Sequence, residues 1–379
     1  MRLLKLAKRN TDRAFHTFCK IVFRFEKDVP SDTVLIVRTD GIGDMVFFAR
    51  YLEAIHETYR GSKLVLCCRT ETAELARAIP LFDEVMEFRS VPCRRNYFYR
   101  WRVLRQVRSV RPSVAIYASY HREHVGDEIT LLSGARVTIA FSGNDECIHP
   151  SLRLHNDKFF TCLLRVKDHC PEKEKYDTLA EVIGDGSFHG SFGGSGRDSY
   201  LDAIAQRSDV LPHDLIGCRF VMLGPGGSGP IRRWHRRKFS DLANRISKEF
   251  NLAIVLCGNR DERAILAEIA GGIHDKALVY SDFTIVQVVE VLSRAVAFVG
   301  NESGLLHLAA SLGIPAVGIL GGGHFSRYFP YGSVRVVNHP LDCYECNWRC
   351  KFPNPYCITE ISVDDVLREV RALPLSPSK

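Results

Sequence analysis

The chain has 379 residues, of which 46% are apolar and 25% are charged, a composition typical of a globular protein with room for two domains. Its 13 cysteines, several of them within apolar runs, favour a reducing compartment and argue against a disulfide-linked secreted fold. The formal net charge is +7, but no apolar run approaches the roughly 18 to 20 residues that span a bilayer, and no aromatic ladder indicates nucleic-acid binding.

Residues 1–29 are predicted to form a basic amphipathic helix, because residues 1–28 contain eight Lys or Arg against three Asp or Glu. The side chains expected on its apolar face recur at steps of three and four, at Leu4, Ala7, Thr11, Ala14, Phe18, Val22 and Phe25. We interpret the helix as a contact with an anionic membrane surface; the alternative is a helix packed on the first domain with a solvated basic face. The segment is too charged for a signal peptide, so we expect a cytoplasmic protein.

Residues 30–185 are predicted to form a doubly wound α/β domain. A β-branched run from Thr33 to Thr39 ends in the glycine-containing turn Asp40 to Asp44, and a helical pattern follows from Met45 to Tyr59. Further strands, with helical stretches between them, are expected at 63–69, 84–88, 113–119 and 136–141. This alternation is typical of a parallel sheet with helices on both faces.

Glycine and serine dominate the stretch 184–199, and we assign residues 186–217 to a linker region. The alternation of strands and helices then restarts in residues 218–379, with strands expected at 219–223, 252–257, 277–280, 295–299 and directly after Pro315. The sequence therefore predicts an α/β protein with two Rossmann-like doubly wound domains that face a central cleft, where ligands usually bind.

A polar turn from Gly300 to Gly304 joins a buried strand to a helix of small residues. The first backbone N–H groups of such a helix and the positive end of its dipole form an anion site, and phosphate is the commonest biological occupant. The alternative is an ordinary helix start in which Ser303 caps the helix and Glu302 only favours the dipole.

Two other segments are strongly basic. The turn after Gly224 is followed by Arg232, Arg233, Arg236, Arg237 and Lys238, which predict a phosphate clamp or, alternatively, a solvated loop. Between Arg89 and Arg111 there are eight arginines and no acidic residue. That second segment is interpreted as a helix whose basic face is either solvated or contacts an anionic acceptor or lipid headgroup.

Four motifs in order resemble glycosyltransferase family 9, the ADP-heptose:lipopolysaccharide heptosyltransferases. They are RTDGIGDMV, GPGGSGPIRRWHRRKFSDLANRI, VGNESGLLHLAASLGIPAVGILGG and CYECNWRCKFPNPYC, and the resemblance covers residues from about 33 to 370. It implies the GT-B architecture and inverting sugar transfer from a nucleotide-diphosphate donor. It implies no cofactor and no required metal.

The resemblance also assigns roles to single residues. Asp44 matches the acid of the GD turn and is expected to act as general base, whereas from the sequence alone it reads as a helix N-cap. Gly227 and Ser228 match positions that meet the donor phosphates. Arg232 stands where the family has lysine, which keeps the charge but changes its geometry. Trp234 matches a family tryptophan and is either a packing anchor or a ligand contact.

In the later turn, Ser303, Gly304 and His307 match the family's [ST]GxxH pattern and are expected on the donor side. Glu302 stands where the family has aspartate, and its extra methylene moves the carboxylate by about 1 to 1.5 Å in a site where positioning matters. His307 is interpreted either as holding the turn through a hydrogen bond or as a satisfied core histidine.

Four cysteines lie within fifteen residues near the end of the chain, at Cys343, Cys346, Cys350 and Cys357. Their C-x2-C-x3-C-x6-C spacing leaves two interpretations: a structural zinc site, or free packed thiols, which we favour.

We therefore expect an inverting glycosyltransferase that moves a heptose or related sugar, with ADP-heptose as donor. The acceptor would be a lipopolysaccharide core or another lipid-linked glycan, and the enzyme would be peripheral on the inner face of a bacterial inner membrane. The alternatives are a transferase that uses another UDP- or GDP-sugar for polysaccharide synthesis, and a catalytically weak nucleotide-sugar-binding protein.

Overall fold

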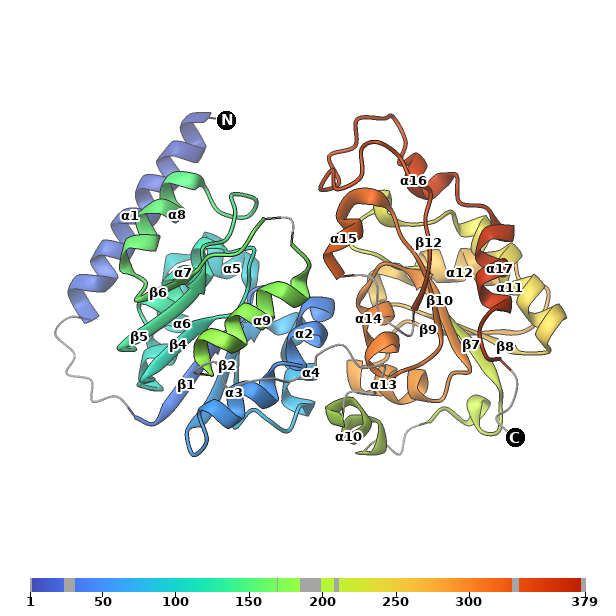
Figure 1. Cartoon of the computed structure of the whole chain (residues 1–379), viewed down its shortest axis with the longest axis horizontal. Helices are drawn as coiled ribbons and strands as arrows, with labels where there is room; N and C mark the ends of the chain where they lie inside the picture. The colour runs from blue at the N-terminus through green and yellow to red at the C-terminus, as the bar shows by residue number, and fades with distance from the viewer. Residues whose placement is uncertain are drawn as a thin grey trace. The chain divides into compact units, whose positions relative to one another are not determined.

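The computed structural model describes residues 2–23, 31–168, 170–184, 199–207, 211–328 and 334–375. The chain divides into two compact units, the first comprising Met1–Cys170 and Glu174–Gly190, and the second Pro171–Lys173 and Ser191–Lys379. Each unit is built around one six-stranded parallel sheet (Figure 1). No helix in the described part of the chain is both long and apolar enough to cross a bilayer.

The sheet of the first unit has the strand order β3-β2-β1-β4-β5-β6. Its strands are β1 Thr33–Val37, β2 Lys63–Arg69, β3 Glu84–Phe88, β4 Val114–Tyr117, β5 Val137–Phe141 and β6 Cys162–Leu164. All five residues of β1 are buried, because helices cover both faces of the sheet, and this explains the unbroken apolar run in the sequence.

The helices of the first unit follow the strands in the usual alternation. They are α1 Arg2–Phe23, α2 Ile42–Ala49, α3 Leu52–Thr58, α4 Thr70–Ala78, α5 Ser90–Arg95, α6 Tyr97–Ser109, α7 His124–Leu131, α8 Pro150–Asn156 and α9 Glu172–Ile183. Side chains of α1, α6 and α7 share one hydrophobic core with the sheet. The predicted single helix over residues 45–59 is in fact the pair α2 and α3.

Helix α1 packs on the first unit beside α8 (Figure 1). Its docked side carries Asp12, His16, Cys19 and Phe23, all buried. The ring of Phe23 stacks on Trp101 of α6 with 4.9 Å between centroids. The packed-helix alternative is therefore observed, and membrane contact stays a prediction.

The docked side of α1 is not the apolar row that the sequence suggested. Ala14 and Phe18 of that row are exposed, while Phe25 and the side chains of Leu4 and Ala7 lie outside the described residues. The reason is an ion-pair cluster beneath the helix: Arg100, 1% exposed, places Nη1 3.1 Å from both Asp12 and Glu128. Apolar periodicity does not reveal a helix face that is docked through buried charges.

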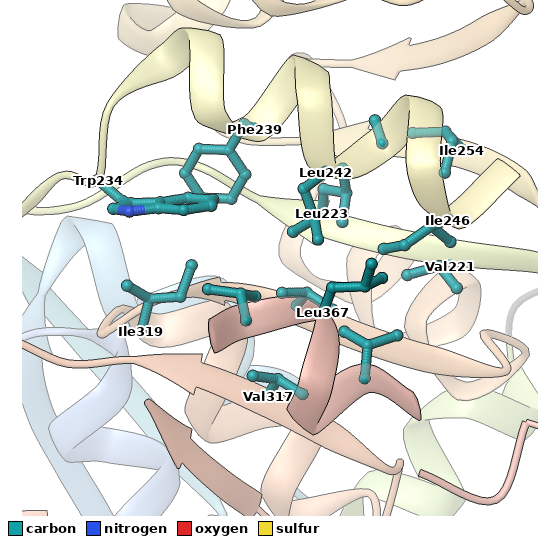
Figure 2. Close-up of a cluster of buried hydrophobic side chains, with 14 of the residues drawn as sticks. Val221, Leu223, Trp234, Phe239, Leu242, Ile246, Ile254, Val317, Ile319 and Leu367 are labelled. Atoms are coloured by element: carbon teal, nitrogen blue, oxygen red, sulfur yellow. The ribbon is translucent and has the colours of Figure 1, made fainter. Parts of the chain in front are cut away.

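The sheet of the second unit has the order β12-β11-β10-β7-β8-β9. Its strands are β7 Phe220–Gly224, β8 Ala253–Cys257, β9 Ala277–Tyr280, β10 Ala297–Asn301, β11 Ala316–Ile319 and β12 Val334–Val337. The helices are α10 Ser199–Arg207, α11 Arg236–Phe250, α12 Arg263–Gly271, α13 Ile285–Ser293, α14 Gly304–Ser311, α15 Phe325–Tyr328, α16 Tyr356–Thr359 and α17 Val363–Arg371. Helices α11, α12 and α17 contribute to the core on one face of the sheet (Figure 2), and α13 and α14 lie on the other face (Figure 1).

Helix α10 lies inside the stretch 186–217 that the sequence assigns to a linker. It packs against α13 and buries Tyr200, Leu201 and Ile204. The rest of that stretch up to residue 198, together with residues 208–210, is outside the described residues. The short apolar pattern of α10 is hard to detect beside the glycine- and serine-rich run that precedes it.

Candidate active site

The carboxyl ends of β7, β10 and β11 are neighbours at one edge of the second sheet, because the three parallel strands are adjacent. The segment after β7, the turn after β10 and the start of α14 carry the predicted donor-side residues, which are Gly227, Ser228, Arg232, Glu302, Ser303, Gly304 and His307. The structure thus assembles at one sheet edge two motifs that lie about 70 residues apart in the sequence, as expected for parallel α/β sheets.

Asn301 links these turns, and sequence reasoning did not single it out. Its side chain is fully buried, and Nδ2 donates to the carbonyl oxygens of Pro225 (2.7 Å) and Gly226 (3.2 Å). Its Oδ1 accepts from the backbone N–H of Trp234 at 3.0 Å. One side chain from the end of β10 therefore fixes both ends of the loop that carries Arg232.

Glu262 is a second residue that the sequence did not reveal. It is 8% exposed, and its two carboxylate oxygens accept from the backbone N–H groups of Gly227 and Asn259, each at 3.0 Å. Arg233 completes the arrangement by donating to the carbonyl oxygen of Gly227 at 2.7 Å. Both the N–H and the carbonyl oxygen of Gly227 are thus hydrogen-bonded to side chains of the protein. The family resemblance did not suggest these contacts.

The five basic residues after Gly224 do not form one phosphate clamp. Arg233 braces the loop, Arg236 pairs with Glu268, and Lys238 donates to the carbonyl oxygens of Thr359 and Ile361. The sequence pattern could not anticipate these partners, because they come from other parts of the chain. Arg232 differs, since its guanidinium carbon lies 4.7 Å from the ring centre of Trp348.

The start of α14 has the geometry expected of an anion site. Ser303 occupies the N-cap position with φ −157° and ψ 173°, yet its side chain makes no capping hydrogen bond. Its Oγ is buried and has no hydrogen-bond partner among the described residues. Simple capping by Ser303 is therefore not observed, and a buried hydroxyl beside the first amides of a helix suits an anionic ligand.

Glu302 and His307, which belong to the same motif as Ser303, are both buried. Glu302 is 7% exposed and His307 is 5% exposed. The His307 ring meets Tyr328 edge-on, with 4.9 Å between ring centres. His307 is therefore packed within the turn region.

Trp234 is a packing anchor, which was one of its two predicted roles. It is 1% exposed, meets Phe239 edge-on and lies within the core of the second unit (Figure 2). Its Nε1 donates to the carbonyl oxygen of Ile361 at 2.9 Å. Both its apolar body and its polar atom are therefore satisfied by the protein.

In the first unit, Asp44 lies at the third position of α2 rather than at its N-cap, which is Gly41. Oδ2 of Asp44 accepts from the backbone N–H of Gly41 at 3.3 Å. Beneath this turn Arg38 is fully buried; it pairs with Asp40 at 2.7 Å and donates to the carbonyl oxygen of Asp44 at 3.0 Å. A buried arginine thus holds the turn that presents Asp44.

Asp40 was also missed by sequence reasoning, although it stands two residues after Arg38 at the end of a buried strand. Burial raises the pKa of Asp40 to about 6; Arg38 opposes this shift and the charge of Asp44 adds to it. A carboxyl group that titrates near neutral pH therefore lies close to the predicted base.

Three of the eight arginines between residues 89 and 111 make contacts that hold the first unit together. Arg100 belongs to the buried cluster beneath α1, and Arg94 pairs with Glu123. Arg108 donates to the carbonyl oxygen of Phe23, the last residue of α1. The other five arginines are exposed, as the solvated-face interpretation expects: Arg89, Arg95, Arg102, Arg105 and Arg111.

Cys357 is buried and Cys343, Cys346 and Cys350 are partly buried; none of the four is in a disulfide. Burial raises the pKa of the Cys357 thiol, and the other three cysteines add to this shift. Within the described ranges no three His, Cys, Asp or Glu side chains are arranged to hold a metal ion.

The two doubly wound parallel units define the GT-B class, and this prediction is confirmed. The Escherichia coli ADP-heptose lipopolysaccharide heptosyltransferase II aligns with 90% of this chain and 98% of its own, with a TM-score of 0.64 and 17% identity. A glycosyltransferase family 9 protein of Veillonella parvula aligns with 91% and 98%, with a TM-score of 0.73 and 16% identity. At such identities the likeness establishes the fold.

Residues 200–353 match the model of glycosyltransferase family 9 (heptosyltransferase), so the resemblance is confirmed over this part of the chain. The lipooligosaccharide heptosyltransferase 2 of Campylobacter jejuni is 23% identical over 165 residues, which are 41% of this chain and 52% of that protein. Its counterpart in Haemophilus ducreyi is 32% identical over 123 residues, 30% and 35% of the two chains. The chain thus spans about half or less of the length of these curated relatives.

Proposed function

We propose that the protein is an inverting glycosyltransferase that transfers a heptose from ADP-heptose to a lipopolysaccharide core or a similar glycan. The family 9 domain and the names of the relatives support this reaction. The observation that carries the donor side is the buried Oγ of Ser303 at the start of α14, which has no hydrogen-bond partner among the described residues.

The donor pyrophosphate would bind at the edge formed by β7 and β10. Ser303 Oγ would donate to a phosphate oxygen, and the first amides of α14, beginning at Gly304, would donate beside it. Arg232 would supply a positive charge from the loop that Asn301 fixes. Ser228, exposed on the same loop, and Glu302 would complete the donor contacts.

The chemistry would be a single displacement. Asp44 takes the proton from an acceptor hydroxyl while the hydroxyl oxygen attacks the anomeric carbon. The bond from that carbon to the pyrophosphate oxygen breaks. The leaving ADP gains negative charge, which Arg232 and the α14 N-terminus would stabilise. Attack opposite the leaving group inverts the anomeric centre.

Thermal unfolding with ADP-heptose, ADP-, GDP- and UDP-sugars tests the donor assignment, because a ligand that binds the native state at about 100 times its Kd stabilises it by about 2.7 kcal/mol. We expect ADP-sugars to raise Tm and the others to leave it nearly unchanged. Ser303→Ala should reduce the ADP shift, and the exposed Ser109→Ala should not. A shift only with UDP- or GDP-sugars would replace the donor, and no shift with any would refute the proposal.

A binding protein with little turnover is the second candidate, and Glu302 in place of aspartate is the observation that favours it. Such a protein would show the ADP-sugar shift but release no ADP in the presence of acceptor. Steady release of ADP from ADP-heptose with a lipopolysaccharide acceptor would exclude it.

We further propose that α1 contacts the anionic inner face of the bacterial inner membrane. Phe18 and Ile21 of α1 are 54% and 56% exposed. Large exposed apolar side chains on a helix of basic composition suit an anionic bilayer surface.

Flotation with vesicles tests this contact. Wild type should bind vesicles that contain phosphatidylglycerol and bind pure phosphatidylcholine weakly. Replacing Phe18 and Ile21 with serine should abolish flotation, whereas Ile216→Ser, at an equally exposed apolar residue of the second unit, should not. Equal flotation of all variants would contradict the proposal.

A further inference from the structure

The cysteine-rich segment, residues 342–357, has no role in the proposed reaction, yet it is bound closely to the turn after β11. The backbone N–H of Glu345 donates to the carbonyl oxygen of Gly322 at 2.6 Å, and that of Asn347 donates to Gly323 at 3.0 Å. The Asn347 side chain also contacts the ring of His324. The segment is therefore held at the same sheet edge as the proposed donor site.

Glycines in that turn allow two aromatic rings to lie directly on the backbone. A Cβ at Gly322 would stand 2.2 Å from the ring of Tyr344, and a Cβ at Gly323 would stand 2.3 Å from the ring of Trp348. No side chain fits at either position without displacing a ring. The triple glycine after β11 thus leaves the space in which the rings of this segment pack.

The backbone of the segment is held in an uncommon conformation. Glu345, Asn347 and Trp348 have φ values of +62°, +52° and +58°, in the left-handed region that residues other than glycine rarely adopt. Such conformations persist where the surroundings impose them, and they concentrate at functional sites. The contacts with Gly322 and Gly323 supply that constraint.

The conformation places the ring of Trp348 4.7 Å from the guanidinium carbon of Arg232. Nε1 of Trp348 is buried and has no hydrogen-bond partner within the described part of the chain, whereas Nε1 of Trp234 is bonded to Ile361. Trp348 therefore lacks the polar anchor of a purely structural tryptophan, and its contact with Arg232 is a cation–π interaction.

We propose that Trp348 is a positioning residue that orients the Arg232 guanidinium toward the donor pyrophosphate, and that the cysteine-rich segment serves to hold this tryptophan. This inference rests on the proposed function, because it takes Arg232 as a phosphate ligand. It assigns the segment to phosphate binding by the second unit.

A double-mutant cycle with ADP as the probe tests the proposal, using Arg232→Met, Trp348→Leu and the double variant. A cation–π contact of ordinary strength predicts that Trp348→Leu weakens ADP binding about three- to tenfold, and that the double variant binds no more weakly than Arg232→Met alone. Trp348→Phe, which keeps a ring, should restore binding to within about twofold of wild type. Phe352→Leu changes an aromatic residue of the same segment whose ring centre lies 5.6 Å from that of Tyr356, and it should leave ADP binding unchanged.

Unaltered ADP binding by Trp348→Leu, or losses that multiply in the double variant, would overturn the positioning role. If wild type itself does not bind ADP, the proposed function fails. The double-mutant cycle then uses the free energy of unfolding in urea in place of ADP affinity. If the loss of unfolding free energy in the double variant is smaller than the sum of the two single losses, the Trp348–Arg232 contact is supported. Additive losses would contradict it. If Trp348→Leu does not fold, Trp348→Phe and Trp348→Tyr replace it: losses of ADP binding that vanish in the Arg232→Met background support the role, and equal losses in both backgrounds refute it.

Discussion

Replacing Asn301 with alanine tests the brace that joins the two donor-side turns. The change removes three hydrogen bonds and leaves the buried carbonyl oxygens of Pro225 and Gly226 and the N–H of Trp234 without their partner. At about 1 kcal/mol for each stranded group, the second unit should lose about 3 kcal/mol of unfolding free energy. For a unit of this size the loss corresponds to a fall in Tm of roughly 6 to 12 °C.

Calorimetric unfolding of wild type, Asn301→Ala and Asn244→Ala measures this effect. Asn244 is a matched control because its side chain also makes two hydrogen bonds, to Gly272 and His274, but is only partly buried on α11. We expect Asn244→Ala to lower Tm by no more than about 3 °C, since water replaces its partners. Equal effects of the two substitutions would refute the reasoning, as would an Asn301→Ala protein with wild-type Tm and wild-type ADP affinity.

Three further predictions follow from other contacts. Glu302→Asp restores the shorter side chain typical of the family and should raise the rate of ADP release about three- to tenfold in initial-rate assays. A lower rate would show that the site is adapted to glutamate. Glu128, against the opposing effect of burial, raises the pKa of His124, so stabilisation by the imidazolium is present below its unfolded pKa of about 6.5 and is lost as pH rises through the folded pKa. His124→Gln should therefore lower Tm more at about pH 6 than at about pH 9, and a pH-independent difference would contradict this. Gly322→Ala places a methyl group 2.2 Å from the Tyr344 ring and should cost about 1 to 3 kcal/mol in urea unfolding; an unchanged midpoint would show that the segment moves freely.

The two parallel sheets were predictable because their central strands are nearly continuous apolar runs. The expected strands 33–39 and 252–257 contain β1 and β8, respectively. Strands β6 and β12 were missed, since they have three and four residues and lie at sheet edges, where the apolar signal is weakest. Short edge strands depend on pairing with a neighbour more than on their own sequence.

The candidate site was predictable only where glycine turns follow strands. The turns at 40–44, 224–229 and 300–304 all occur at carboxyl ends of strands, as their sequences indicated. The residues that hold those turns were not predictable. Asn301 and Glu262 act through backbone groups far away in sequence, and such pairings leave no periodic signal.

Helix α1 shows a different limit of sequence reasoning. Its period was evident, but its docked face is defined by Arg100 and Glu128, which lie about 90 or more residues further along the chain. Buried charges in a helix face are indistinguishable from solvated charges until their partners are known. Phe18 belongs to the apolar row that the packed-helix alternative would bury, yet it is exposed.

The most direct test of the account is the rate of heptose transfer from ADP-heptose to a lipopolysaccharide acceptor by wild type and Asp44→Asn. Asparagine keeps the size of the side chain but cannot take a proton, so transfer should fall by about 100-fold or more while ADP affinity, which we assign to the second unit, stays unchanged. Glu57→Gln, at an exposed carboxylate of the same unit, should transfer at the wild-type rate. Transfer by Asp44→Asn at the wild-type rate would contradict the assignment of Asp44 as base and, with it, the mechanism proposed for this protein.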